Sequence, residues 1–179
     1  MLRVIAIGGE PGSGKTTLMR HVMKDLGFDS PIHEEVKMVP FHQKANLFVL
    51  GKYEEEGVFA GTDRMSMAVQ PEAVKFLATM PEKAVVLFEG DRLFNQSFLE
   101  HCNENYDLKI VGLLTDKAEK AKRYQSRGSN QDPFWLKGRE TKVQTILSNL
   151  GLMFVTEKFE NNTFDDQKVI LDHIYNLVR

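Results

Sequence analysis

The sequence predicts an α/β fold, a three-layer α/β/α sandwich around a mostly parallel sheet. Short runs at residues 4–7, 84–88 and 108–114 are almost continuously apolar, which is typical of strands that are buried on both faces. Each run is followed by a polar turn and then by apolar residues at helical spacing. Because strands and helices alternate along the chain, right-handed crossovers are expected to place helices on both faces of one sheet.

The first strand, at residues 4–7, ends in two glycines and leads into a helix. Gly27 is expected to end this helix, because glycine readily adopts the backbone conformation found just past a helix end. The positions that recur near helical spacing are Thr17, Leu18, His21, Val22 and Leu26.

The segment after this helix is less regular. Residues 36–41 and 46–50 are expected to form the two strands of a hairpin around a turn at 42–45. Pro40 favours an edge position, because proline cannot donate a hydrogen bond to a neighbouring strand. Residues 57–67 are then expected to form a loop that enters the next helix.

A polar insertion is expected between two helices in the second half of the chain. Thr115 or Asp116 can cap a helix that runs to about residue 127, and helical spacing returns at residues 140–150. The residues between, about 128–138, are polar and rich in turn formers. The sequence therefore predicts a short, mobile lid at this place.

The chain is expected to close with a strand at residues 153–159 and a helix at residues 164–178. A length of 179 residues with 42% hydrophobic composition is enough for one sizeable core and too short for two ordinary domains. We therefore expect a single domain over residues 1–179, with the lid as an insertion.

The composition narrows the possible partners and location. The 23 basic and 25 acidic residues give a net charge of −2, so no long-range field favours a nucleic acid or a membrane surface. The single cysteine, Cys102, excludes an intramolecular disulfide and fits a reducing compartment. The apolar run at residues 2–7 is too short to span a membrane and lacks a signal-peptide cleavage site. We expect a cytoplasmic protein without a membrane partner.

The clearest chemical signal is a phosphate-binding loop between the first strand and the first helix. Its glycines let backbone N–H groups turn toward phosphates, and the helix adds its unpaired N–H groups and positive dipole end. Lys15 is expected to contact the β- and γ-phosphates of ATP or GTP, and the Thr16 hydroxyl is expected to bind Mg²⁺. A glycine-rich turn without a ligand is the alternative, but such a turn has no use for both side chains. The pattern G-x-x-x-x-G-K-[ST] is matched by Gly9, Glu10, Pro11, Gly12, Ser13, Gly14, Lys15 and Thr16, and Thr17 continues it into the helix.

Two carboxylates follow the second apolar strand. Glu89 comes directly after residues 84–88, where a carboxylate can hold phosphate-bound Mg²⁺. Asp91 is a candidate base for the acceptor hydroxyl, and Arg92 lies beside it at the edge of the sheet where ligands of such folds bind. A surface ion pair or a helix cap is the alternative for Asp91 and Arg92. The sequence leaves open which carboxylate is the base and which holds the metal.

Basic side chains are expected to frame the lid. Arg123 and Arg127 lie four residues apart and so share one face of a helix, and Arg139 lies where the chain returns. Arginines on a closing lid would neutralise charge on a transferred phosphoryl group and help to exclude water. The alternative is a solvated basic helix face. Phe134 and Trp135 within the lid can stack on a base or pin the lid to the protein.

These residues resemble the P-loop kinase superfamily, in particular the nucleoside and nucleotide kinases related to thymidylate kinase. The resemblance rests on the phosphate loop, on the strand-end segment from Glu89 to Arg92, and on the lid arginines. It implies a P-loop NTPase fold and transfer of the ATP γ-phosphate, with Mg²⁺, to a nucleotide-like small molecule. It also places an acceptor-binding segment at residues 61–64, where Asp63 and Arg64 would read the acceptor. In that reading Lys15, Asp91, Arg92 and the lid arginines are the catalytic residues.

The chain is also similar to bacteriophage thymidylate-kinase-like enzymes that phosphorylate 5-hydroxymethyluracil already incorporated in DNA. Residues 61–64 and the lid carry this second resemblance. It implies modified DNA as the partner and the host cytoplasm as the location. An ATPase or GTPase, with water as the acceptor, and a regulatory module that binds nucleotide without chemistry are the remaining alternatives. The lid arginines and Asp91 favour phosphoryl transfer over both.

Overall fold

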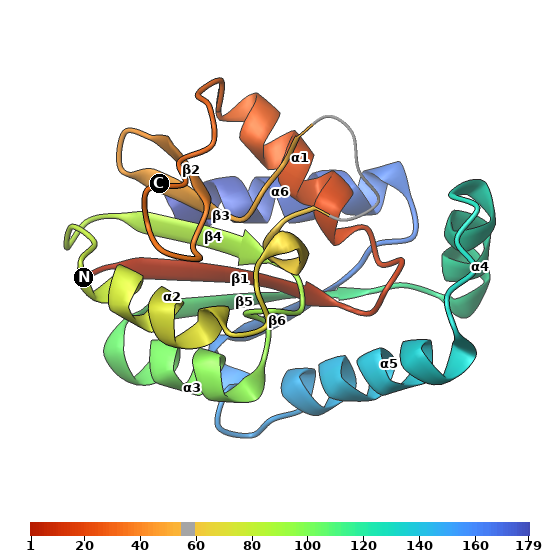
Figure 1. Ribbon diagram of the computed structural model, residues 1–179. Coiled ribbons are helices and arrows are strands. Elements are labelled where there is room, and N and C mark those ends of the chain that lie inside the picture. Colours follow the sequence, from red (N-terminus) through yellow and green to blue (C-terminus); the bar gives the residue numbers. More distant parts are fainter. Residues whose placement is uncertain (55–59) are drawn as a thin grey trace.

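Six strands form one sheet in the order β2-β3-β4-β1-β5-β6 (Figure 1). The computed structural model describes residues 1–54 and 60–179. Neighbouring strands run parallel except for the antiparallel β2–β3 pair, so the predicted α/β fold with a mostly parallel sheet is confirmed. The strands are β1 (Arg3–Gly9), β2 (Phe41–Lys44), β3 (Leu47–Leu50), β4 (Val85–Glu89), β5 (Asp107–Leu114) and β6 (Thr156–Glu160).

Helices cover both faces of the sheet and complete the three layers (Figure 1). The α1 and α6 helices pack on one face, and α2, α3 and α5 pack on the other. The α4 helix lies beyond the carboxyl ends of the strands. The helices are α1 (Lys15–Asp25), α2 (Val69–Ala78), α3 (Gln96–Asn105), α4 (Lys117–Ser126), α5 (Pro133–Leu147) and α6 (Phe164–Val178), with short 3₁₀ turns at η1 (Thr62–Arg64) and η2 (Met153–Val155).

The central strand β1 brings the phosphate loop and the strand-end carboxylate to one edge of the sheet. Residues 4–7 have no exposed surface, as expected for a strand with helices on both faces. Ile7 pairs in parallel with Glu89 of β4 on one side and with Val111 of β5 on the other. Because the three strands point the same way, the segments that follow them open at the same edge, where ligands of such folds bind.

The hairpin exists, but its first strand and its turn lie later in the sequence than predicted. The strand expected at residues 36–41 begins only at Phe41, because Pro40 has no N–H to donate and Met38 adopts a left-handed turn with φ of 62°. The β2 strand then runs to Lys44, so most of the turn expected at residues 42–45 is strand. The β2 strand lies at the edge of the sheet, as Pro40 indicated. The expected loop at residues 57–67 lies partly outside the described residues, and from residue 62 it contains the unpredicted turn η1.

The lid expected at residues 128–138 is largely helical, which corrects the sequence-based boundary. The α5 helix begins at Pro133, where Asp132 caps it by accepting a 2.7 Å hydrogen bond from the Phe134 N–H. Only residues 127–132 join α4 to α5, and the helix expected from residue 140 starts one and a half to two turns earlier. The last strand likewise starts at Thr156, after the turn η2, and the closing helix matches its predicted bounds.

Candidate active site

The phosphate loop wraps between β1 and α1 with its glycines in left-handed conformations. Gly12 and Gly14 have φ of 79° and 90°, values that other residues rarely adopt, and Gly14 caps the helix. The Lys15 ammonium lies across the loop and donates to the carbonyls of Gly9 (2.9 Å) and Glu10 (3.2 Å). Burial lowers the pKa of Lys15, and the nearby carboxylate of Glu89 opposes this effect. The lysine is thus held at the place where its charge can act on phosphates.

Thr16 and Glu89 meet across the edge of the sheet, as the sequence predicts for two metal-binding side chains. The Thr16 hydroxyl donates to Glu89 Oε1 over 3.1 Å. The Tyr53 hydroxyl donates to the same oxygen over 2.9 Å. Gly61 lies so close that a Cβ on it would be 2.3 Å from Glu89 Oε1. Two segments far apart in the sequence, one with Thr16 and one with Tyr53 and Gly61, therefore surround one carboxylate oxygen.

The second oxygen of Glu89 is buried and has no hydrogen-bond partner among the described residues. The side chain is only 1% exposed, and burial raises the pKa of its carboxyl from 4.5 to about 7, against the attraction of Lys15. A buried carboxylate oxygen without a donor is costly unless a cation binds it. Mg²⁺ prefers oxygen ligands and usually takes one or two protein oxygens together with phosphate and water. The Thr16 hydroxyl and the Glu89 carboxylate fit that ion.

A cavity of about 520 Å³ extends from the phosphate loop to the ends of β4 and α5. Its floor includes Phe94, whose ring lies directly against the backbone of Gly8. Some of the site residues predicted from the sequence are not part of the described lining, namely Glu10, Ser13, Gly14, Thr17, Arg64 and Arg123. The predicted site residues that do line it are Gly9, Pro11, Gly12, Lys15, Thr16, Asp63, Glu89, Asp91, Arg92, Arg127 and Arg139.

Asp91 is engaged by two cations. Its carboxylate forms ion pairs with Arg139 and with Lys142, whose ammonium is 3.1 Å away. Asp63, in contrast, accepts a 2.7 Å hydrogen bond from the Asp91 N–H with one oxygen and lies in the same cavity. Burial raises the pKa of Asp63, and the Lys15 ammonium is the largest opposing influence. Asp63 thus lies among the cavity's charged groups without a salt bridge of its own among the described residues.

Two of the three lid arginines reach the cavity. Arg127 lines it, and Arg139 lines it with its guanidinium 4.8 Å from the centre of the Trp135 ring. Arg123 instead points at the loop and donates to the Gly12 carbonyl over 3.0 Å.

The acceptor-side arginines also separate. Arg92 lines the cavity and donates from Nε to the Met65 carbonyl over 3.3 Å. Arg64 forms a 2.8 Å ion pair with Glu54 on the protein surface. Of the two, Arg92 is therefore the one placed to meet a bound acceptor.

Sequence reasoning missed several side chains of this site, among them Tyr53 and Lys142. Tyr53 follows β3, which lies next to β4 in the sheet. A polar side chain just after a strand can reach the edge of the sheet where ligands bind, and this position could have identified Tyr53. Lys142 lies three residues after Arg139 on α5, and that spacing places both cations on one side of the helix.

Comparisons with known proteins found similar solved structures. A solved structure of an uncharacterized protein from Eubacterium ventriosum has a TM-score of 0.51 and 16% identity over 98% of this chain and 97% of that one. Two further matches also cover 98% of this chain and 97% of the other. They are a gluconokinase from Sinorhizobium meliloti (TM-score 0.49, 14% identity) and a shikimate kinase from Bacteroides thetaiotaomicron (TM-score 0.41, 15% identity). No curated protein matches the chain.

Within the described ranges, none of the helices is long and apolar enough to cross a membrane.

The family model described as P-loop Nucleotide Kinase3 matches residues 1–158, which is most of the chain and includes the phosphate loop, the strand-end carboxylates and all three lid arginines. The chain is therefore a member of the P-loop nucleotide kinase 3 family.

Proposed function

We propose that the protein transfers the γ-phosphate of ATP, or of GTP, to a nucleotide- or nucleoside-type acceptor in the presence of Mg²⁺. The observation that carries this proposal is that one cavity is lined both by Lys15 and Thr16 of the phosphate loop and by Asp63 and Arg92. A cavity that holds groups for both a donor phosphate and a second polar molecule fits a transferase. Its volume of about 520 Å³ lies in the range of small-molecule sites.

The donor side of the cavity fits the phosphates of a nucleoside triphosphate. Inward backbone N–H groups and Lys15 would hold the β- and γ-phosphates, and Thr16 with Glu89 would hold Mg²⁺. When bound, Mg²⁺ neutralises charge on the phosphate oxygens. Arg127 and Arg139 line the cavity from the lid side and would stabilise charge on the transferred group.

Asp63 is the stronger candidate for the base that accepts the acceptor's proton. A base needs a carboxylate with an oxygen available to the substrate hydroxyl. Asp91, the base proposed from the sequence, has its carboxylate bound by Arg139 and Lys142. We assign Asp91 the role of anchoring Arg139 beside the phosphates, and Asp63 the role of the base.

The acceptor is expected to lie against Arg92 and Trp135, which line the cavity and do not belong to the phosphate loop. Arg92 can pair with a phosphate of the acceptor, and the Trp135 ring can stack on a base. Arg64 is directed to Glu54 outside the cavity, so its expected role in acceptor binding falls to Arg92. A free nucleotide or nucleoside is our first choice of acceptor.

Modified DNA is the second candidate, and one observation favours it. Phe134 is 86% exposed at the start of α5, directly beside Trp135 at the cavity. An exposed aromatic ring next to a cavity suits a base that is extruded from DNA and needs stacking support. The phage-type activity, phosphorylation of 5-hydroxymethyluracil within DNA, would use this rim.

The test is transfer of labelled γ-phosphate from ATP and from GTP to a panel of nucleosides, nucleotides and DNA that contains 5-hydroxymethyluracil. Label on free nucleosides or nucleotides supports the first candidate, whereas label on DNA alone supports the second. Transfer to DNA should also weaken steeply with salt, through counterion release, and transfer to a small molecule only modestly. Rapid ATP turnover without any acceptor would contradict both and indicate an ATPase.

A further inference from the structure

One face of α4 contacts three consecutive residues of the phosphate loop. Lys120 forms an ion pair with Glu10, and the Tyr124 hydroxyl donates to the Pro11 carbonyl over 2.5 Å. The next carbonyl, of Gly12, accepts from Arg123 over 3.0 Å. Residues at spacings of three and four share one side of a helix. The helix therefore holds the loop through the Glu10 side chain and two consecutive carbonyls, and these contacts use none of the loop N–H groups.

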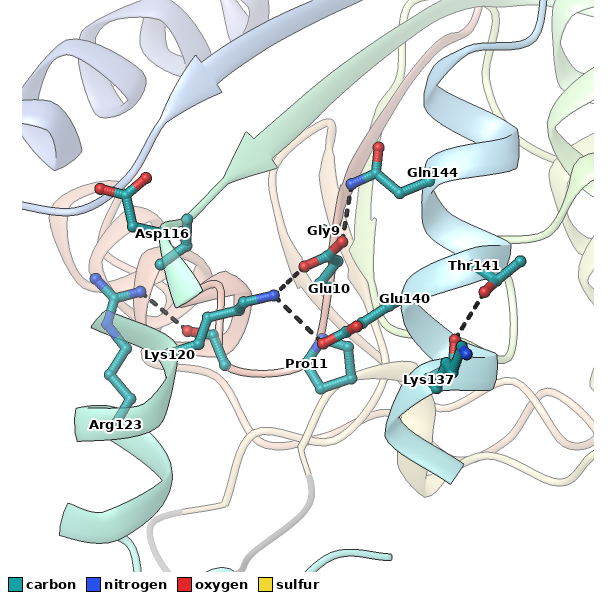
Figure 2. A network of polar contacts seen from close by, with 12 residues as sticks. Gly9, Glu10, Pro11, Asp116, Lys120, Arg123, Lys137, Glu140, Thr141 and Gln144 are labelled. Carbon is teal, nitrogen blue, oxygen red and sulfur yellow. Dashed lines mark hydrogen bonds and ion pairs between the residues drawn. The ribbon is translucent and has the colours of Figure 1, made fainter. Parts of the chain in front are cut away.

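Lys120 is the most enclosed of these side chains. It is only 6% exposed, and its ammonium lies between the carboxylates of Glu10 and Glu140, the latter 3.3 Å away (Figure 2). Glu10 accepts a further hydrogen bond of 2.8 Å from Gln144. Glu140 and Gln144 lie one turn apart on α5, so one loop side chain is held by both helices that flank the lid segment.

Lys120 does not reach the reacting groups directly. It belongs to the lining of a second cavity, of about 420 Å³, between the ends of β5 and β6 and α5, and not to the described lining of the active-site cavity. Its influence on a bound nucleotide must pass through Glu10. A buried ammonium is retained only where partners compensate its charge, which fixes the relative positions of those partners.

We propose that Lys120 is a positioning residue that sets the conformation of the phosphate loop through Glu10 and couples it to the docking of α5 through Glu140. The proposal rests on the proposed function, in that the loop binds ATP. Arg139 precedes Glu140 on α5 and lies in the active-site cavity. The Lys120 ammonium, which contacts the loop through Glu10, therefore also contacts through Glu140 the helix that carries Arg139.

The first test compares Lys120→Met with Lys122→Met. Lys122 lies two residues further along α4 with a side chain that is 77% exposed, which makes it a matched control. The measurements are hydrogen exchange of the backbone amides at residues 10–16 without nucleotide, and the Kd of MgATP by calorimetry. Lys120→Met is expected to raise the exchange rate and the Kd about tenfold each, and the control is expected to leave both unchanged. Equal values in the two variants would overturn the proposal.

A second variant separates positioning from simple charge balance. Lys120→Met leaves the Glu10 carboxylate without its cation, and this alone lowers stability. The double variant Lys120→Met/Glu10→Gln removes both charges, so its thermal stability is expected to return toward that of the natural protein while the Kd of MgATP stays raised. Recovery of both quantities together would show that Lys120 only compensates a buried charge, and would refute the positioning role.

A third variant tests the link to α5. Glu140→Gln keeps the Lys120–Glu10 pair and loosens the helix that carries Arg139, so it is expected to lower kcat severalfold with the KM for ATP nearly constant. An unchanged kcat would disprove the coupling. Failure of the proposed function would appear differently, as no transfer by the natural protein to any acceptor. The exchange and MgATP-binding measurements test Lys120 without turnover.

Discussion

Glu89→Gln is expected to stabilise the metal-free protein at neutral and alkaline pH while it weakens the response of transfer to Mg²⁺. The carboxyl is 1% exposed, and burial raises its pKa from 4.5 to about 7. The folded state therefore holds this proton more tightly than the unfolded state does. The protonated Glu89 carboxyl therefore contributes fully to stability below pH 4.5, and this contribution is lost as the pH rises through about 7.

The size of the effect follows from the two pKa values. One pKa unit corresponds to about 1.4 kcal/mol, so the rise from 4.5 to about 7 corresponds to about 3 kcal/mol at pH 8. Glutamine is neutral at every pH and has nearly the same shape. Its amide N–H₂ would occupy the place of Oε2, which has no described partner, and we subtract about 1 kcal/mol for that. The variant should be more stable by about 2 kcal/mol at pH 8, and not at pH 5.

The assay is thermal unfolding, followed by circular dichroism, between pH 5 and pH 8 with a chelator and without nucleotide. For a domain of this size, 2 kcal/mol corresponds to a Tm increase of about 4 to 8 °C. Glu104→Gln, at an exposed position of α3, is the control for loss of one negative charge. A Tm difference for Glu89→Gln that does not grow with pH, or that equals the control, would refute the reasoning. The same variant should require much more Mg²⁺ for transfer if Glu89 binds the ion.

Four further substitutions test the site. Lys15→Ala should lower the transfer rate by about 100-fold or more with an unchanged Tm, because its charge acts on phosphates and not in the core, and near-normal transfer by the folded variant would contradict its role. Asp63→Asn should lower kcat by about 100-fold, and Asp91→Asn by only about tenfold, as judged by transfer kinetics at saturating ATP; the reverse order would restore Asp91 as the base. Gly61→Ala should lower the free energy of unfolding by about 2 to 4 kcal/mol in chemical denaturation, because φ is +68° and the new Cβ would lie 2.3 Å from Glu89; a neutral effect would contradict this packing.

Most of the fold could be predicted because its information is local. The strands β1, β4 and β5 are buried on both faces, and such strands consist of short apolar runs that can be read without knowing their neighbours. The start of α5 was missed because Phe134 is exposed and the first turns of this helix lack a buried apolar face. Its true signal was the dipeptide Asp132-Pro133, a helix cap followed by a favourable first residue.

The site was predictable only in part for a related reason. The phosphate loop is contiguous in the sequence, so its pattern identifies it. The partners of Asp91, in contrast, come from α5, about 50 positions later, and Arg123 reaches back 111 positions to Gly12. Which cation meets which anion depends on the docking of whole helices, and residue spacing does not encode that. The four-residue spacing of Arg123 and Arg127 predicted a shared helix face, but Arg127 lies just past the end of α4 and lines the cavity, whereas Arg123 holds the loop.

The close contact between Gly8 and Phe94 makes the shape of the active-site cavity depend on the absence of a side chain at residue 8. A Cβ on Gly8 would lie 1.9 Å from the Phe94 ring, so any other residue would displace this ring, which lines the cavity. Gly8 is itself part of a central buried strand, where it pairs with Gly112 of β5, and the preceding Ile7 pairs with both β4 and β5. The ring, and not the strand, would have to yield. A substitution at residue 8, one position before the phosphate loop, would therefore change the shape of the cavity without altering any polar group of the site.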